Sequence, residues 1–193
     1  MTVEWDAEQA RLQRRAGVLR ERLGIDEALA RIGSATLVGS AALGVMVARD
    51  IDVTVTVSAL GSDVRTAVAE LAACLSIRDD VREVTLRNDL GRWNTDPLYP
   101  DGIYLHVHCA DIDDEPWTID IWFVDDPARQ PDLQHLETIG SRITAEAQAT
   151  ILAIKRATGG RRPDGSRLPS ILIYEAVLDH GVLSAGDFSS IDR

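Results

Sequence analysis

Cysteine and lysine are scarce in this chain of 193 residues, and their scarcity excludes several classes of protein. The two cysteines, Cys74 and Cys109, form neither a disulfide framework nor the close ligand spacing of a zinc site. A reducing compartment fits this pattern, and we predict a cytoplasmic protein. Lysine is represented by Lys155 alone, so a function that needs a lysine has one candidate.

Long apolar runs and positive charge are scarce as well. No stretch approaches the roughly 20 apolar residues of a membrane-spanning helix, and the first residues do not have the pattern of a signal peptide. The formal net charge of -11 repels phosphate backbones, so we expect neither a membrane nor a long nucleic acid as a partner. A local basic pocket for one nucleotide is compatible with this charge.

The most informative stretch is a strand with two aspartates at its start. From Asp50 and Asp52 onward, polar residues of one parity alternate with β-branched apolar residues of the other, which is typical of a half-buried strand. Side chains two residues apart point to the same face, so the two carboxylates project together and repel each other. A divalent cation with oxygen ligands would offset that repulsion. An edge strand with a solvated polar face is the alternative interpretation.

A Gly-Ser pair precedes this strand. Residues 36–40 form a short apolar run that ends in Gly39 and Ser40, and we predict a buried strand followed by a turn. Glycine lets a phosphate or a second backbone approach closely, and free N–H groups at the start of a helix attract phosphate. An ordinary turn between a strand and a helix is the alternative.

Together these residues resemble the nucleotidyltransferase superfamily that includes DNA polymerase β. Its signature is an apolar residue, Gly-Ser, a short gap, and Asp-x-Asp leading into an apolar strand. This chain has Val38, Gly39 and Ser40, then nine residues, then Asp50 to Val53. The superfamily also has a third carboxylate on a later strand, and Asp120 in the apolar segment 117–124 fits that place. Small polar residues usually precede the first aspartate, whereas Val47, Ala48 and Arg49 stand there in this chain.

The resemblance implies a metal-dependent enzyme. Asp50, Asp52 and Asp120 would be the catalytic acids and the ligands of two Mg²⁺ ions, and Gly39 and Ser40 would bind the phosphates. The expected reaction moves a nucleoside monophosphate from an NTP, for which we favour ATP, to a hydroxyl group of a small molecule or protein, with release of pyrophosphate. A non-catalytic, nucleotide-binding regulatory or antitoxin-like module is the alternative.

The resemblance also gives Lys155 a role. In several families of the superfamily, a lysine on a helix after the third acid contacts the triphosphate, so Lys155 would bind the nucleotide. An exposed helix lysine is the alternative. Some antibiotic-modifying members carry a carboxylate one turn before that lysine, where this chain has Ile151, with Glu146 nearby.

Periodicity predicts an α+β fold, with a mixed β-sheet covered by helices on one face and C-terminal helices that wall the cleft. The length fits one compact unit, in which 1–143 would be the catalytic core with an N-terminal helix and 144–193 the C-terminal helical segment. The expected helices are residues 4–23, 26–32, 62–75, 144–157 and 169–181. The expected strands are residues 36–40, 50–57, 81–89, 103–110 and 117–124.

Several groups near these strands have open roles. His106 and His108 share one face of the strand 103–110, where we single out His108, and an H-x-H pair either binds metal or lines a polar face. The aspartates of the acidic turn, Asp111, Asp113 and Asp114, are expected to face solvent and are the alternatives to Asp120 as the third acid. Trp93 and Tyr99 in the loop 90–102 either stack on a ligand or pack the loop down. In the loop 158–169, Arg161, Arg162 and Arg167 would form a phosphate clamp or a solvated connector.

Overall fold

The computed structural model describes residues 2–191 of the chain, with side chains from 7 to 189, and places five segments in one mixed sheet. The strand order is β1-β2-β5-β4-β3. Strands β2 and β5 run parallel, and the other neighbouring pairs run antiparallel. The strands are β1 (Ser34–Val38), β2 (Asp50–Thr56), β3 (Val81–Asp89), β4 (Gly102–Ala110) and β5 (Pro116–Val124).

Alternation along the strands separates the two faces of the sheet. In β2, Ile51, Val53 and Val55 are buried in the main core, whereas Asp50 and Asp52 have the opposite parity. The same alternation places the apolar residues of β5 in that core. One face is therefore apolar, and the other carries the polar side chains that concern the site.

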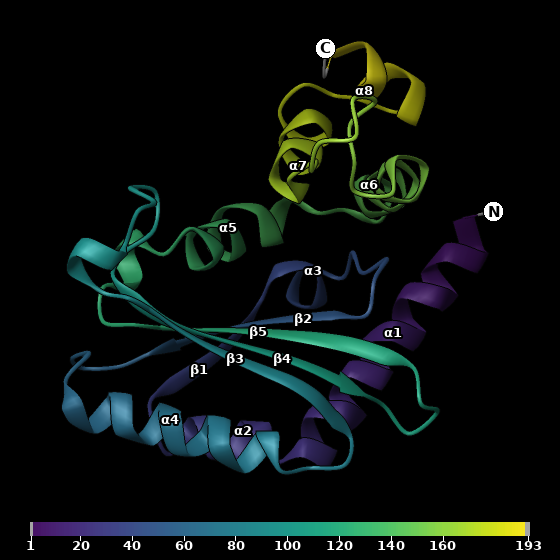
Figure 1. The fold of residues 1–193 in the computed structure, drawn as a ribbon. Helices are drawn as coiled ribbons and strands as arrows, with labels where there is room; N and C mark the ends of the chain where they lie inside the picture. Colours follow the sequence, from purple (N-terminus) through teal and green to yellow (C-terminus); the bar gives the residue numbers. More distant parts are fainter. Residues whose placement is uncertain (1, 192–193) are drawn as a thin grey trace.

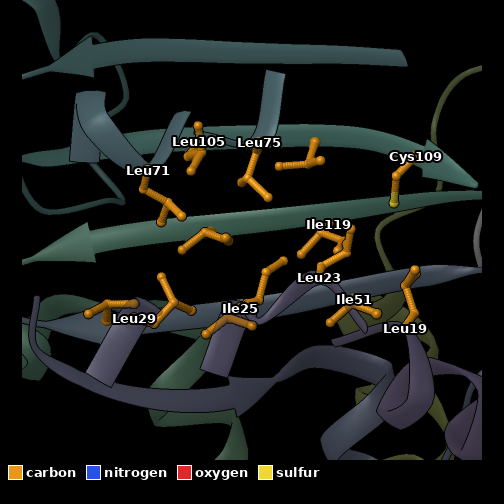
Figure 2. Packing of buried hydrophobic residues seen from close by; sticks show 14 of the residues in the cluster. Leu19, Leu23, Ile25, Leu29, Ile51, Leu71, Leu75, Leu105, Cys109 and Ile119 are labelled. Atoms are coloured by element: carbon orange, nitrogen blue, oxygen red, sulfur yellow. The ribbon is translucent and has the colours of Figure 1, made fainter. Parts of the chain in front are cut away.

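Three helices cover the apolar face, as Figure 1 shows. They are α1 (Thr2–Leu23), α2 (Ile25–Ala30) and α4 (Ser62–Ser76). Leu19 and Leu23 of α1 and Leu71 and Leu75 of α4 meet the strands in one cluster (Figure 2). Burial of a leucine side chain contributes about 1.5–3 kcal/mol, so this apolar stripe is enough to hold each helix on the sheet.

The C-terminal helices lie on the other side of the sheet (Figure 1). They are α5 (Pro131–Ile139), α6 (Ala145–Thr158), α7 (Ser170–Leu178) and α8 (Ala185–Ile191). They form a second apolar cluster, which includes Ile151 and Leu152 of α6, and Leu43 and Val45 join it from the chain before β2. Thr144 caps α6, because its hydroxyl accepts a hydrogen bond from the Ala147 amide at 3.2 Å.

The α+β class and the mixed sheet are confirmed, and each predicted strand lies within a few residues of its expected place. Helix α8 was not predicted, because its short apolar pattern follows a turn near the end of the chain. The division at residue 143 stays a prediction, and residues 1 and 192–193 of its two segments lie outside the described part. Within residues 2–191, no helix combines the length and apolar character that crossing a bilayer requires.

Candidate active site

The parallel pairing of β2 with β5 brings the three predicted acids together. In this register Asp52 lies opposite Asp120, and Asp50 lies opposite Thr118. One carboxylate oxygen from each of Asp50, Asp52 and Asp120 lies within 4.8 Å of the others. Two strands with 59 residues of sequence between them thus build a single group of carboxylates.

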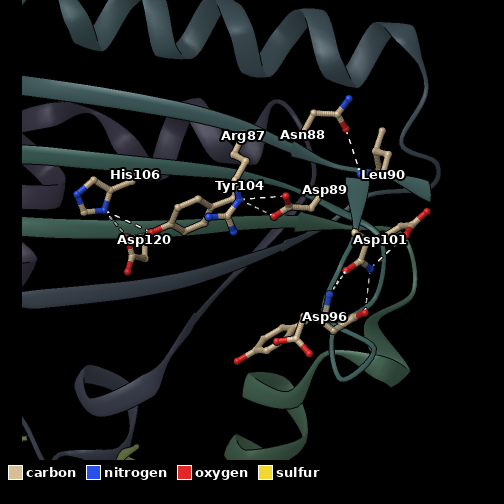
Figure 3. A network of polar contacts seen from close by, with 11 residues as sticks. Arg87, Asn88, Asp89, Leu90, Asp96, Asp101, Tyr104, His106 and Asp120 are labelled. Atoms are coloured by element: carbon tan, nitrogen blue, oxygen red, sulfur yellow. Dashed lines mark hydrogen bonds and ion pairs between the residues drawn. The ribbon is translucent and has the colours of Figure 1, made fainter. Parts of the chain in front are cut away.

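Neighbouring side chains hold two of these carboxylates. The Thr118 hydroxyl donates to Oδ1 of Asp50 at 2.7 Å. Oδ1 of Asp120 accepts a hydrogen bond from the Tyr104 hydroxyl at 2.6 Å, and Nδ1 of His106 also lies 2.6 Å from this oxygen (Figure 3). The two acids therefore have fixed orientations before any ligand binds.

Asp52 is placed differently. No side-chain hydrogen bond to it occurs in the described part of the chain, and its carboxylate packs against Gly39. Gly39 has a φ of +61°, and the Cβ of any other residue there would overlap with the Asp52 carboxylate. The glycine of the motif thus makes room for the second aspartate.

Burial and mutual repulsion keep these acids from ionising easily. Burial raises the pKa of Asp52 to about 8, and the charges of Asp50, Asp120 and Asp132 add to the effect. Burial also raises the pKa of Asp50, against the hydrogen bond from Thr118. The oxygens of three crowded carboxylates are hard ligands, which fit Mg²⁺. A divalent cation would offset both the repulsion among the carboxylates and the cost of their burial.

This repulsion leads to a stability prediction for Asp52→Asn in the absence of metal. The folded protein keeps a proton on Asp52 up to a pH of about 8, its pKa there, whereas the unfolded chain loses the proton near the ordinary aspartate pKa of 3.8. The folded state therefore binds more protons between these values, and its stability falls as pH rises through that window. Asparagine has no such penalty, so the variant should melt about 3 °C or more above wild type at pH 8 and about equally at pH 4.

Calorimetry in a chelating buffer measures this difference, and Asp79→Asn at an exposed position serves as the control. Equal melting temperatures of Asp52→Asn and wild type at pH 8 would show that the Asp52 carboxylate is not crowded.

Lys155 is buried near these acids rather than exposed, which overturns the alternative of an exposed helix lysine. It is 8% exposed, and its Nζ donates to the Val45 carbonyl at 2.9 Å. Burial lowers the pKa of Lys155 to about 8, although the charges of Asp52 and Asp50 oppose this change. The ammonium group therefore lies within electrostatic reach of the acids. Its contact with a triphosphate stays a prediction.

A cavity of about 700 Å³ adjoins the acids. Besides Asp52 and Asp120, its lining includes Asp132 from the start of α5 and Arg167 from the loop before α7. Burial raises the pKa of Asp132 as well. The loop 90–102 forms another wall of the cavity through Trp93 and Tyr99. This volume suits a ligand of nucleotide size, since pockets for such molecules span about 300–1,000 Å³.

The three arginines of the loop 158–169 do not share one site, and the two aromatics of the loop 90–102 differ in how they pack. Arg167 lines this cavity, and its charge partly opposes the rise in the pKa of Asp50 that burial causes. Arg161 and Arg162 line a smaller hollow of about 260 Å³ instead. Tyr99 packs on Trp122, with ring centroids 5.7 Å apart. Trp93 is 58% exposed and leaves much of its ring open.

Two expectations about the β4–β5 hairpin are wrong. His106, and not His108, lies beside the third acid, because the antiparallel register pairs His106 with Asp120 and His108 with Thr118. In the acidic turn, Asp113 and Asp114 are exposed as expected, but the expectation fails for Asp111, which is 7% exposed. Its carboxylate accepts from the Trp117 indole at 2.8 Å and pairs with an arginine of α1. It therefore serves the hairpin's structure.

Sequence reasoning also missed three residues of the site. Tyr104 has the alternating position of a strand residue, and an aromatic there indicates packing before it indicates a hydrogen bond. Thr118 likewise belongs to the polar parity of β5 without any motif. Asp132 follows Pro131 in a segment with only weak helical periodicity. The parity of β4 and β5 is the one signal that could have placed Tyr104 and Thr118 beside the acids.

Comparison with known proteins identifies the fold but no sequence relative. No protein-family model matches the sequence, and no curated protein matches it. Solved structures of the Cid1 poly(U) polymerase are similar, one a variant bound to MgATP (TM-score 0.57, 17% identity) and one a complex with the UTP analogue UMPNPP (TM-score 0.53, 15% identity). A cytoplasmic RNA terminal U-transferase is also similar (TM-score 0.51, 14% identity).

These matches cover 93%, 91% and 91% of this chain, but 56%, 53% and 51% of the solved chains. The chain thus spans about half of the length of these proteins. At this level of identity the likeness shows a shared fold, and that fold is the nucleotidyltransferase fold which the Gly-Ser and Asp-x-Asp resemblance predicts.

Proposed function

From the nucleotidyltransferase fold and the carboxylates that it brings together, we propose that this protein transfers a nucleoside monophosphate from an NTP to a hydroxyl group and releases pyrophosphate. The observation that carries this proposal is the meeting of Asp50, Asp52 and Asp120 within 4.8 Å on neighbouring strands. Similar proteins have been solved with MgATP, MgGTP and a UTP analogue, which supports an NTP as donor. ATP is the donor that we favour.

Each part of the site has a distinct task in this proposal. The three aspartates would hold two Mg²⁺ ions, which, when bound, supply positive charge against the phosphates. Gly39 and Ser40, at the start of α3 (Gly39–Leu43), would bind the phosphates through backbone N–H groups. Lys155 and Arg167 would add positive charge on the side of the C-terminal helices. The cavity, which Asp52, Asp120 and Arg167 line, would hold the acceptor with its oxygen in line with the leaving pyrophosphate.

The charge of the cavity supports a small molecule or a protein side chain as acceptor. Asp89, Asp96 and Asp132 line it in addition to the acids of the site, against two arginines, Arg87 and Arg167. Phosphates of an RNA strand would meet repulsion along such walls. RNA is nevertheless the second candidate acceptor, because the similar structures include a poly(U) polymerase and an RNA terminal U-transferase.

The first test is thermal melting with and without Mg²⁺ against each of the four NTPs. A specific NTP at about 100 times its dissociation constant adds about 2.7 kcal/mol of stability, which raises the melting temperature by about 5 °C in a chain of this size. We expect this rise with one NTP or a subset and only when Mg²⁺ is present. The preferred NTP, labelled at the α-phosphate, is then incubated with aminoglycosides, proteins and single-stranded RNA.

If label is transferred only to RNA, then RNA is the acceptor, and the small-molecule or protein acceptor is wrong. An NTP-dependent rise in melting temperature without transfer or pyrophosphate release to any acceptor would favour the non-catalytic, nucleotide-binding module. No shift with any NTP would refute the proposal as a whole.

A further inference from the structure

The third acid of the site receives two donors from a strand that carries none of the three aspartates. In the antiparallel register, His106 of β4 lies directly opposite Asp120, and Tyr104 lies two residues along on the same face. The Tyr104 hydroxyl and Nδ1 of His106 both lie 2.6 Å from Oδ1 of Asp120 (Figure 3). The O···O separation is typical of a hydroxyl that donates to a charged carboxylate.

Both donors converge on one oxygen of this carboxylate. The Tyr104 hydroxyl donates to Oδ1, and where Oδ1 accepts from the imidazole as well, Nδ1 of His106 carries the hydrogen. Burial and the hydrogen bond to Asp120 raise the pKa of Tyr104, which keeps its hydroxyl protonated. The other oxygen, Oδ2, has no side-chain donor within the described residues and is left for another ligand.

The surroundings fix Tyr104 in turn. The Arg87 guanidinium lies 4.6 Å from the centroid of the Tyr104 ring, and the Trp122 ring lies 4.9 Å away on the opposite neighbour strand. Arg87 is itself paired with Asp89 at 2.8 Å. A row of side chains across β3, β4 and β5 thus prevents Tyr104 from turning away from Asp120.

We infer that Tyr104 and His106 are positioning residues, which bind Oδ1 of Asp120 so that Oδ2 is presented to a divalent cation shared with Asp50 and Asp52. The inference rests on the proposed metal site but not on the transfer reaction. Of the three acids, Asp52 has no side-chain donor in the described chain, and Asp50 has one, from Thr118. Asp120 is therefore the most firmly oriented of the three ligands, and the loss of its donors would let it rotate out of the site.

Residues that orient a metal ligand typically change metal affinity by about 10–100-fold when they are removed. We therefore expect Tyr104→Phe and His106→Ala each to bind Mn²⁺ about tenfold more weakly than wild type. In His106→Asn the side-chain amide takes the place of Nδ1–H, so this variant should recover most of the affinity. His108→Ala removes a histidine from the same face of the same strand, opposite Thr118, and should bind like wild type.

The measurement is a titration of metal-free, full-length protein with Mn²⁺, with the free ion followed by electron paramagnetic resonance. Circular dichroism melts confirm that each variant is folded. If His106→Ala does not fold, the affinity of Tyr104→Phe decides the inference. Wild-type affinity in both Tyr104→Phe and His106→Ala would overturn the inference, as would equal losses in His106→Asn and His106→Ala. If wild type binds Mn²⁺ and the variants bind weakly, but no NTP is turned over, the inference stands and the proposed reaction fails.

Discussion

Asp50→Asn is expected to lower nucleotidyl transfer by about 1,000-fold while the protein remains folded. The amide keeps the size of the carboxylate but loses the charge that would hold a metal ion, and metal-ion catalysis is worth several kcal/mol of transition-state stabilisation. Each factor of ten corresponds to about 1.4 kcal/mol, so a loss of about 4 kcal/mol gives this ratio. The measurement is the rate of label transfer from the preferred NTP at saturating Mg²⁺.

The companion variant for this experiment is Thr118→Val. It removes only the hydroxyl that donates to Asp50 at 2.7 Å and keeps the carboxylate itself. A loss of about tenfold, well short of that in Asp50→Asn, is expected from a residue that only orients a ligand. Full transfer activity in Asp50→Asn would sink the assignment of the site.

Gly39→Ala is expected to remove Mg²⁺ binding and to lower transfer by at least about 100-fold. At a φ of +61°, an alanine is strained by about 1–2 kcal/mol, and its Cβ would overlap with the Asp52 carboxylate. Because Asp52 is held by packing and not by a side-chain hydrogen bond, it would be displaced from the group of acids. The loss of the Mg²⁺-dependent rise in melting temperature measures this displacement.

Gly24→Ala separates the strain from the clash. Gly24 has nearly the same backbone conformation, with a φ of +64°, and a Cβ there would meet no atom within 4 Å. This variant should lose about 1–2 kcal/mol of stability and keep both Mg²⁺ binding and transfer. If Gly39→Ala behaves like Gly24→Ala, the close packing of Gly39 on Asp52 has no role in the site.

The three acids were predicted from the sequence through the resemblance to the nucleotidyltransferase signature, and the strong local patterns of their strands supported that resemblance. Strict alternation places Asp50 and Asp52 on one face, and Asp120 stands alone among apolar neighbours. The alternation does not determine which strand pairs with which. The pairing of Asp52 with Asp120 depends on a parallel contact between distant strands, and only the fold defines it.

Residues whose roles depend on register or burial were beyond local patterns. Both His106 and His108 have the parity that faces the acids, so alternation alone does not show which of them lies beside Asp120. The register of β4 against β5 decides it, and a shift of two residues would exchange the two histidines. The burial of Lys155 depends on the packing of α6 and α7 around the loop before β2. The burial of Asp111 similarly depends on Arg15, which arrives from α1. Tertiary contacts decided each of these cases.

The burial of the single lysine makes its amine a chemical reporter. Acylating reagents modify ε-amines that are exposed and uncharged, and Lys155 is enclosed between the Val45 carbonyl and the Tyr174 ring and hydroxyl. Burial lowers the pKa of Lys155 to about 8, and opening removes that burial, so at a fixed pH the rate of acylation follows how often the amine becomes accessible. With no other lysine in the sequence to compete, the rate of lysine acylation measures how often the C-terminal helices part from the chain before β2. A bound nucleotide that bridges these two parts would slow the reaction without any change in the reagent.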